Sequence, residues 1–314
     1  MIEQSTIRIA TRSSSLALWQ ADHIRKLLSK NHLDCRFELI EISTSGDQNR
    51  TQSLGEIGGT GLFTKEVQKA VLDHRADLAV HSLKDLPTVP VDGLILAGVP
   101  RRAARYDSLV FSAEQRSKLK NKNESLDILN AGLCVGTSSP RRAAQVLSLC
   151  PQARVKDIRG NVETRLAKVE TGEYDAIVLA VAGLRRLGFG TKIDYELHPP
   201  EFYPAVAQGA LGIECRTDDK TMQTMLHGLT DAETLAEVTA ERSLLFQLGA
   251  GCHAPVGVET IIANQMLTIS AVVLSPNGTR RLFSQQTGSS ENPEQIATRT
   301  ADDLFRQGAE TLLL

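Results

Sequence analysis

The sequence predicts an α/β protein in which two doubly wound units precede a small α+β unit. First, short apolar strands alternate with helical periodicity from Ile7 to Cys215, which favours parallel pairing with right-handed crossovers. Second, this alternation is interrupted after Pro100 and again around Pro204, where the chain crosses between units. Third, after Thr221 the pattern changes to one long helix, three strands and a terminal helix.

These breaks predict three domains. Domain 1 covers residues 1–102 and 205–222, domain 2 covers 103–204, and domain 3 covers 223–314. Domain 1 is discontinuous because the strand expected at 209–215 returns to its sheet, which gives two hinge crossings.

In domain 1, strands are expected at 7–11, 37–42, 78–81 and 94–99, and helices at 16–28 and 63–74. The serines after Arg12 are natural N-caps for the first helix. The glycine-rich loop at 48–61 fits either a mobile lid or a plain surface loop.

In domain 2, strands are expected at 107–112, 133–137, 155–158 and 176–181, with a charged surface insert at 114–124. Ser139 followed by Pro140 predicts a helix that reaches residue 149. Arg159-Gly160-Asn161 is expected to cap a helix that reaches Val169.

In domain 3, a helix is expected at 231–248 and strands at 256–262, 267–274 and 280–286. Ser275-Pro276-Asn277-Gly278 predicts the hairpin turn between the last two strands. A final helix is expected at 293–307.

Composition indicates a soluble globular protein, with 41% hydrophobic and 23% charged residues among 314. The net charge of −2 gives no general attraction to nucleic acid or anionic membranes. The N-terminus shows no signal-peptide pattern, and no apolar run is long enough for a membrane span, so we expect a cytoplasmic protein.

The five cysteines are scattered, with no Cys-x-x-Cys pair and no Cys/His cluster, so no metal site is expected. Cys252 stands out because Gly249, Gly251 and Pro255 place it in a turn between a helix and a strand. The turn favours a displayed thiol, although a small buried hydrophobe is the alternative. His253 adjoins Cys252, but adjacent side chains diverge, so a Cys–His dyad is not expected.

Four predicted strand-to-helix junctions combine small polar residues with arginine. Ligands bind at the carboxyl ends of strands in open parallel sheets, and helix N-termini favour anions. Because arginine forks suit carboxylates and no phosphate-loop motif is present, we expect a cleft for a ligand with several carboxylates. The junctions are Thr11-Arg12-Ser13-Ser14, Thr137-Ser138-Ser139-Pro140-Arg141-Arg142, Arg159-Gly160-Asn161 with Arg165, and Gly183-Leu184-Arg185-Arg186.

One acid, Asp85, follows a buried strand and stands beside Lys84. It fits a helix cap or a partner of Lys84. It also fits a functional carboxylate that neighbouring arginines keep ionised and that stabilises a cation developing on the substrate.

Five motifs in this order resemble the porphobilinogen deaminase family along the chain from about Ile7 to the C-terminus. The motifs are His81-Ser82-Leu83-Lys84-Asp85, Gly136-Thr137-Ser138-Ser139-x-Arg141-Arg142, Arg159-Gly160-Asn161-x-x-Thr164-Arg165, Ala180-Val181-Ala182-Gly183-Leu184 and Gly251-Cys252. The resemblance implies a three-domain monomer whose first two domains are similar to type II periplasmic binding proteins.

The resemblance also implies a dipyrromethane cofactor in thioether linkage to Cys252. The implied reaction joins four porphobilinogen molecules head to tail with loss of ammonia and then releases the linear tetrapyrrole by hydrolysis. Asp85 would be the catalytic carboxylate, and Phe63 would stack near the incoming ring. The other implied binding residues are Arg12, Ser14, Ser82, Lys84, Thr137, Ser139, Arg141, Arg142, Arg159, Asn161, Arg165, Arg186 and Gln208.

Thr60 stands where the family usually has lysine, and Pro140 where leucine is common. Two other functions fit parts of the pattern: a solute-binding protein that closes on a polycarboxylate, and a transferase that uses Cys252 as a turnover nucleophile.

Overall fold

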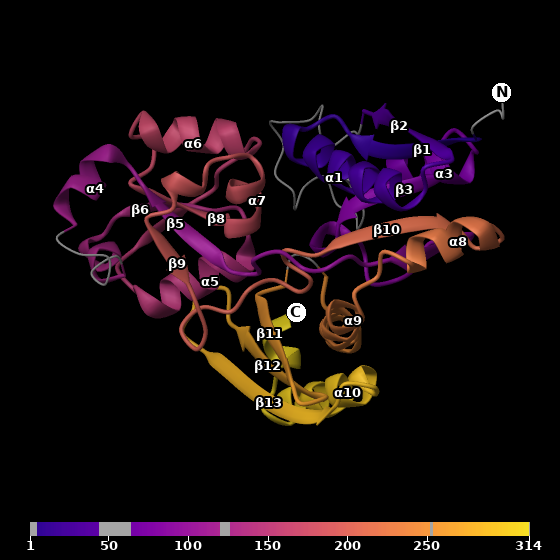
Figure 1. Cartoon of the computed structure of the whole chain (residues 1–314). Helices are drawn as coiled ribbons and strands as arrows, with labels where there is room; N and C mark the ends of the chain where they lie inside the picture. The colour runs from indigo at the N-terminus through magenta and orange to yellow at the C-terminus, as the bar shows by residue number, and fades with distance from the viewer. Residues whose placement is uncertain (1–4, 44–63, 120–125, 252–253, 314) are drawn as a thin grey trace. The chain divides into compact units, whose positions relative to one another are not determined.

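The computed structural model describes residues 5–43, 64–119, 126–251 and 254–313. The chain divides into two compact units, Met1–Ala103 with Ala210–Leu235, and Ala104–Gly209 with Ala236–Leu314 (Figure 1). The loop at 48–61, whether lid or surface loop, lies outside the described residues, and so does Thr60.

The first unit contains a five-stranded sheet of order β2-β1-β3-β10-β4. Its strands are β1 (Ser5–Arg12), β2 (Cys35–Ile42), β3 (Leu78–Ser82), β4 (Leu94–Gly98) and β10 (Leu211–Arg216). β1 pairs parallel with β2 and β3, as expected. β10 returns to this sheet, which confirms that prediction. It runs antiparallel between β3 and β4, so the expectation of parallel neighbours is wrong for β4.

Helices cover both faces of this sheet because its buried strands are apolar on both sides. Ile7 and Ile9 of β1 pack with α1 (Ser15–Asn31) and α8 (Lys220–His227). Ala10 faces the other side and packs with α3 (Lys65–Leu72). Ser14 caps α1, since its hydroxyl accepts a hydrogen bond from the Ala17 N–H at 3.3 Å.

The second unit contains a five-stranded sheet of order β7-β6-β8-β5-β9. Its strands are β5 (Asp107–Phe111), β6 (Cys134–Gly136), β7 (Arg154–Lys156), β8 (Ala176–Ala180) and β9 (Tyr195–Leu197). β6 pairs parallel with β7 and β8, whereas β5 pairs antiparallel with β8 and β9. β9 was not expected from the sequence.

The helices of this sheet begin where the sequence predicts. Ser139 caps α5 (Pro140–Leu149), with Pro140 in the first turn, and Asn161 caps α6 (Val162–Glu170). α5 packs on one face of the sheet, and α6 and α7 (Val181–Arg186) pack on the other.

The predicted surface insert begins with a mostly exposed helix, α4 (Ala113–Lys118), which Ser112 caps by accepting from the Gln115 N–H. One expectation for this unit needs correction. Arg185 and Arg186 lie in the last turn of α7 rather than at its start, so the helix N-terminus does not favour an anion beside them.

The C-terminal residues form the expected small α+β unit. The antiparallel sheet has the order β11-β12-β13, and α10 packs on β12 and β13 (Figure 1). Val272 and Leu274 of β12 pack against Ala144 and Tyr203. The elements are α9 (Ala232–Gln247), β11 (Val256–Ala263), β12 (Met266–Leu274), β13 (Arg281–Ser289), α10 (Pro293–Arg306) and α11 (Glu310–Leu313). The α/β fold class with a small α+β unit is therefore confirmed.

The turn between β12 and β13 requires glycine at position 278. Gly278 has φ 72°, and an added Cβ would lie 2.5 Å from both the Ala144 carbonyl oxygen and the Ser148 nitrogen. We expect Gly278→Ala to lower the free energy of unfolding by about 2–4 kcal/mol, from left-handed strain and overpacking together.

Chemical denaturation of the purified variant measures this loss. The matched control is Gly172→Ala, because Gly172 has φ 77° but nothing within 4 Å of an added Cβ. Strain alone is expected to cost that control about 1 kcal/mol. Equal losses in the two variants would contradict the close approach of the turn to α5.

Candidate functional site

In the first unit, predicted site residues gather at the carboxyl ends of β1 and β3. Ala10 pairs with Ala79 in parallel register, so Arg12 at the end of β1 lies level with His81, next to Ser82. The Ser82 hydroxyl lies 2.7 Å from the Gln20 side-chain nitrogen, which ties this edge to α1. The neighbouring strands thus bring Arg12, Ser14 and Ser82 to one edge of the sheet, as expected.

Asp85 ends a short 3-10 turn, Leu83–Asp85, that follows β3. The turn is anchored by Leu83, whose side chain is fully buried and whose N–H donates to the Ala210 carbonyl at 3.1 Å. An added Cβ at Gly212 would lie 2.7 Å from Leu83 Cδ1, so the glycine leaves room for this anchor. Asp85 itself is exposed, and Lys84 is half-buried. A fixed backbone therefore displays a solvent-accessible carboxylate.

In the second unit, three strand-to-helix connections lie at one edge of the sheet, because β6, β7 and β8 are parallel neighbours. The Ser138 hydroxyl joins two of them, since it donates to the Ile158 carbonyl at 2.7 Å and accepts from the Ile158 N–H at 3.1 Å. Thr137 accepts from the Ser139 N–H at 3.2 Å. Thr137, Ser139 and Asn161 therefore shape these connections, whatever else they bind.

Asp107 is the residue that the sequence did not single out. It is the first residue of β5 and pairs with Ala180, the last residue of β8. Because β5 is antiparallel, its start lies at the same edge as the ends of β6, β7 and β8. The Asp107 side chain thereby meets three predicted site residues, Arg141, Arg142 and Gln208.

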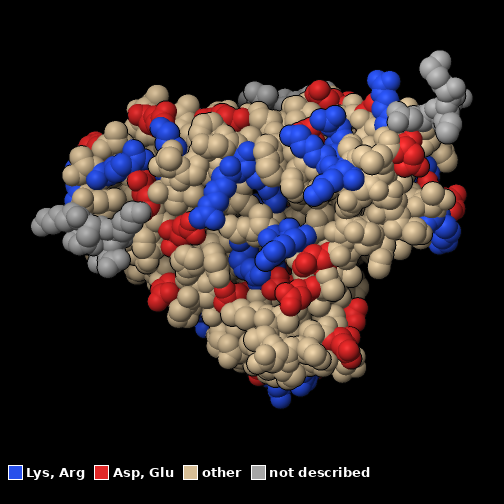
Figure 2. Space-filling model, in the orientation of Figure 1, with Lys and Arg blue, Asp and Glu red and all other residues tan. Residues whose placement is uncertain are grey.

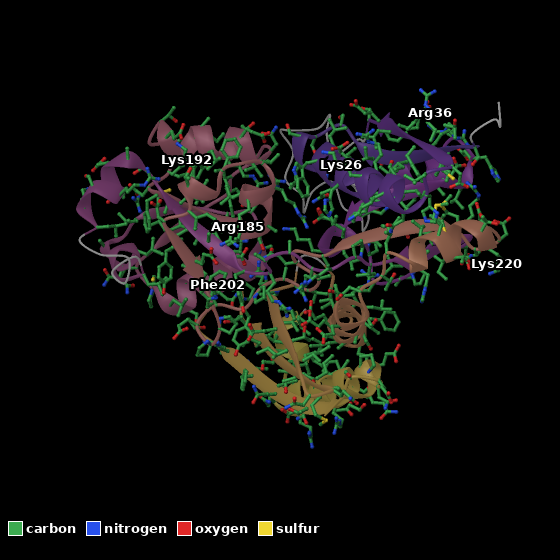
Figure 3. The ribbon with its side chains drawn as sticks, viewed as in Figure 1. Lys26, Arg36, Arg185, Lys192, Phe202 and Lys220 are labelled. Atoms are coloured by element: carbon green, nitrogen blue, oxygen red, sulfur yellow. The ribbon has the colours of Figure 1, made fainter. Side chains whose placement is uncertain are left out.

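The contacts of Asp107 satisfy both carboxylate oxygens. Arg141 Nη2 donates to Oδ2 at 2.7 Å, and Arg142 Nη2 donates to Oδ1 at 2.6 Å. Gln208 Nε2 also donates to Oδ1, at 3.0 Å. Arg141 further donates to the Tyr203 carbonyl at 2.6 Å, and its Cζ lies 5.8 Å from the centre of the Phe202 ring (Figure 3 labels Phe202). The guanidiniums of Arg141 and Arg142 are therefore fixed in place by hydrogen bonds to other residues of this unit.

The charges within this cluster do not cancel. Asp107 is 0% exposed, Arg141 4% and Arg142 7%, so one carboxylate faces two buried guanidiniums. Burial lowers the pKa of Arg141; the Asp107 carboxylate opposes that shift, and the positive charge of Arg142 adds to it. A second anion beside the arginines would offset the cost of burying the extra positive charge.

The remaining predicted arginines of this unit differ in how they are held. Arg186 Nη2 donates to the Gly209 carbonyl at 2.8 Å, and burial lowers the pKa of Arg186 to about 10. Arg165 Nε donates to the Gly160 carbonyl at 2.8 Å, while Arg159 is half-buried. Arg185, labelled in Figure 3, pairs with Glu196 instead.

On the face drawn in Figure 2, basic and acidic side chains of the second unit are interspersed.

Cys252 and Phe63 lie outside the described residues. Cys35 and Cys134 begin β2 and β6, at the edge of each sheet opposite to the arginines. Cys150 and Cys215 are buried, and burial raises the pKa of Cys215 to about 11, which keeps this thiol protonated at neutral pH. None of the four described cysteines is suited to be a reactive thiol at the arginine edges.

Two family models match the chain. The porphobilinogen deaminase dipyrromethane cofactor-binding domain matches residues 7–224, and the porphobilinogen deaminase C-terminal domain matches residues 235–306.

Curated relatives match over the full length. The chain is 44% identical over 308 residues to a porphobilinogen deaminase of Legionella pneumophila (strain Paris), covering 98% of this chain and 97% of that protein. It is 40% identical over 313 residues to a porphobilinogen deaminase of Coxiella burnetii (strain Dugway 5J108-111), covering 100% of this chain and 98% of that protein.

Solved structures give partial likenesses. The Bordetella pertussis BvgS periplasmic VFT2 domain has a TM-score of 0.38 at 15% identity, covering 77% of this chain and 94% of that chain. An ancestral arginine-binding protein bound to arginine has a TM-score of 0.38 at 16% identity, covering 72% of this chain and 90% of that chain.

None of the helices in the described part of the chain is both long and apolar enough to cross a bilayer. Within the same residues, no group of His, Cys, Asp and Glu side chains is placed to hold a metal ion.

We expect the free energy of unfolding to fall strongly when the Asp107 carboxylate is removed. In Asp107→Ala two buried guanidiniums would face each other without their shared counter-charge, and breaking a buried pair of this kind costs about 3–5 kcal/mol. Denaturant unfolding monitored by circular dichroism measures the change in the free energy of unfolding.

The control is Asp22→Ala, which removes a surface carboxylate paired with Arg25 and Lys26 and is expected to cost about 0–1 kcal/mol. If Asp107→Ala were no less stable than this control, the arginine pair would not depend on Asp107.

Proposed function

The chain belongs to the porphobilinogen deaminase family, and from this premise we propose how its own residues carry out the family's reaction. The family's enzyme, hydroxymethylbilane synthase, deaminates porphobilinogen, joins four of these molecules head to tail and releases the linear tetrapyrrole hydroxymethylbilane by hydrolysis. The observation that carries the assignment is the ordered match of both family domains along one chain, with relatives aligned over its full length. A solute-binding protein and a cysteine-dependent transferase are thereby set aside.

The cofactor of this family is dipyrromethane, and the first matched domain is its binding domain. When bound, it supplies a two-ring primer whose free end accepts the incoming ring. We assign its thioether attachment to Cys252. The locations of the four other cysteines support this choice, because they are buried or begin strands at the opposite edge.

The donor set of the second unit suits a ligand that carries carboxylates. Each porphobilinogen brings an acetate and a propionate group, and arginine forks bind carboxylates in two-point geometry. Arg159 and Arg165 are half-buried, whereas Arg141 and Arg142 are buried. The buried Arg141 and Arg142 provide excess positive charge, and Arg186, whose pKa burial lowers, adds a further guanidinium.

Ser14, Ser139 and Asn161 serve as helix caps and retain capacity for a ligand. A capping serine oxygen accepts from the backbone, so its hydroxyl proton remains available for a carboxylate. The Asn161 oxygen accepts from the Thr164 N–H, and its amide hydrogens remain. We assign the further binding roles to Arg12, Phe63, Ser82, Lys84, Thr137 and Gln208.

Asp85 has the catalytic role in this proposal. Loss of ammonia from the protonated aminomethyl group of porphobilinogen leaves a positive charge on the pyrrole and its methylene carbon. A fixed carboxylate accepts hydrogen bonds from pyrrole N–H groups and stabilises that charge through space. The short turn anchored by buried Leu83 supports the assignment, because it holds Asp85 at the end of β3 with its carboxylate accessible.

The three-domain division at 1–102 with 205–222, 103–204 and 223–314 is part of the proposal. Its support is that the described residues form three separate sheets. We further assign the enzyme to the cytoplasm as a monomer that binds no nucleic acid. The four cysteines that the structure describes are thiols, as expected in a reducing compartment, and the net charge is −2.

Intact mass spectrometry tests the attachment site. Protein from tetrapyrrole-competent cells is expected to carry an excess mass equal to two pyrrole rings, and Cys252→Ala is expected to have the bare polypeptide mass, because no other cysteine is placed to form the thioether. Cys134→Ala is the control and retains the excess. A bare wild-type mass, or an excess that persists in Cys252→Ala, would refute the assignment.

Turnover of porphobilinogen tests Asp85. Asp85→Asn keeps the size of the side chain but removes its negative charge, so it is expected to lower kcat by roughly 10²-fold or more without changing thermal stability. Asp92→Asn, at another exposed position of the first unit, is expected to act as wild type. Tetrapyrrole formation at a normal rate by Asp85→Asn would remove Asp85 from the catalytic role.

A further inference from the structure

The connection between β9 and β10 contains a short segment, Ala205–Gly209, which we call the return elbow. Within it, Ala207 adopts φ 56°, a left-handed conformation that is unfavourable for a residue with a Cβ. Ala207 is fully buried, and its N–H donates to Glu241 Oε2 at 2.6 Å. The carboxylate thus stabilises the backbone in this conformation.

The return elbow contacts two groups of ligand-binding arginines. Gln208, directly after Ala207, donates from Nε2 to the Arg105 carbonyl at 2.8 Å and to Asp107 Oδ1 at 3.0 Å. The next residue, Gly209, offers its carbonyl to Arg186 Nη2 at 2.8 Å. The conformation of Ala207 therefore determines where Gln208 meets Asp107 and where Arg186 is held.

Glu241 is itself rigidly placed. It is 0% exposed on α9, and the Thr260 hydroxyl of β11 donates to its Oε1 at 2.6 Å. One carboxylate oxygen is thus bound to β11 and the other to the return elbow. A buried carboxylate with a separate partner for each oxygen has little freedom to shift.

We propose that Glu241 is a positioning residue for the reaction: by holding Ala207 in its left-handed conformation, it fixes Gln208 and, through Asp107, the orientation of Arg141 and Arg142. This role rests on the proposed function, in which those arginines act on the ligand's carboxylates. Glu241 acts through Ala207 and Gln208.

Four variants test this role. Glu241→Ala removes the acceptor for the Ala207 N–H, and Glu241→Gln keeps an oxygen that can accept it. Ala207→Gly allows the left-handed conformation without support, because glycine adopts positive φ at no steric cost. The double variant Glu241→Ala with Ala207→Gly tests whether glycine at position 207 keeps the left-handed conformation without Glu241. Glu233→Ala, an exposed glutamate on the same helix, is the matched control.

Porphobilinogen kinetics and thermal unfolding are measured on each holoenzyme. We expect Glu241→Ala to raise the KM for porphobilinogen roughly 10- to 100-fold with a smaller change in kcat, because misplaced binding groups weaken substrate positioning. Glu241→Gln and the double variant are expected to recover most of this loss, and Glu233→Ala to match wild type. A variant that only lost stability would not raise KM more than it lowers kcat.

The role is overturned if Glu241→Ala has the kinetics of Glu233→Ala, or if Ala207→Gly fails to rescue it. Where Glu241→Ala does not fold, folding of the double variant supports the role, and failure of both contradicts it. Wild-type protein that carries the two-ring mass and turns over porphobilinogen establishes the proposed function separately. A wild type without either overturns the proposed function and this role with it.

Discussion

The second unit depends on one buried interaction, the shared pairing of Arg141 and Arg142 with Asp107. Two positive charges and one negative charge are removed from water, which is tolerated only where the carboxylate accepts several well-aligned hydrogen bonds. Asp107 accepts from both guanidiniums and from Gln208. This arrangement fixes the arginine side chains before any ligand arrives, and it leaves an excess positive charge that a ligand carboxylate can neutralise.

The local features of the fold could be predicted because each depends on a short stretch of sequence. Ser14, Ser139 and Asn161 cap helices as expected, since a side-chain oxygen before a helical pattern satisfies a free N–H whatever surrounds it. Parallel pairing of β1 with β3 and of β6 with β8 follows from strand–helix alternation. The arginines at these strand ends could therefore be grouped before the structure was known.

The features that could not be predicted depend on contacts between distant segments. Nothing in the sequence near Asp107 shows that β5 runs antiparallel, because its partners β8 and β9 follow about 70 to 90 residues later. Read as the start of a parallel strand, Asp107 would lie at the edge away from Arg141 and Arg142. The left-handed conformation of Ala207 could not be predicted for the same reason, since the hydrogen bond that stabilises it comes from Glu241 on α9. The geometry of Cys252, by contrast, lies outside the described residues.

The distribution of arginines matches a ligand that changes length. A single substrate of fixed size is best held by one compact set of donors, but a chain that gains a ring with two carboxylates in each cycle needs equivalent donors at several positions. In the second unit these donors are spread over neighbouring strand ends, with Arg141 and Arg142 buried and fixed and with Arg159 and Arg165 half-buried. The fixed arginines keep the local potential positive at every stage, because their charge does not depend on which ring is present. In the proposed function, the half-buried Arg159 and Arg165 would exchange one carboxylate for the next without rebuilding the site.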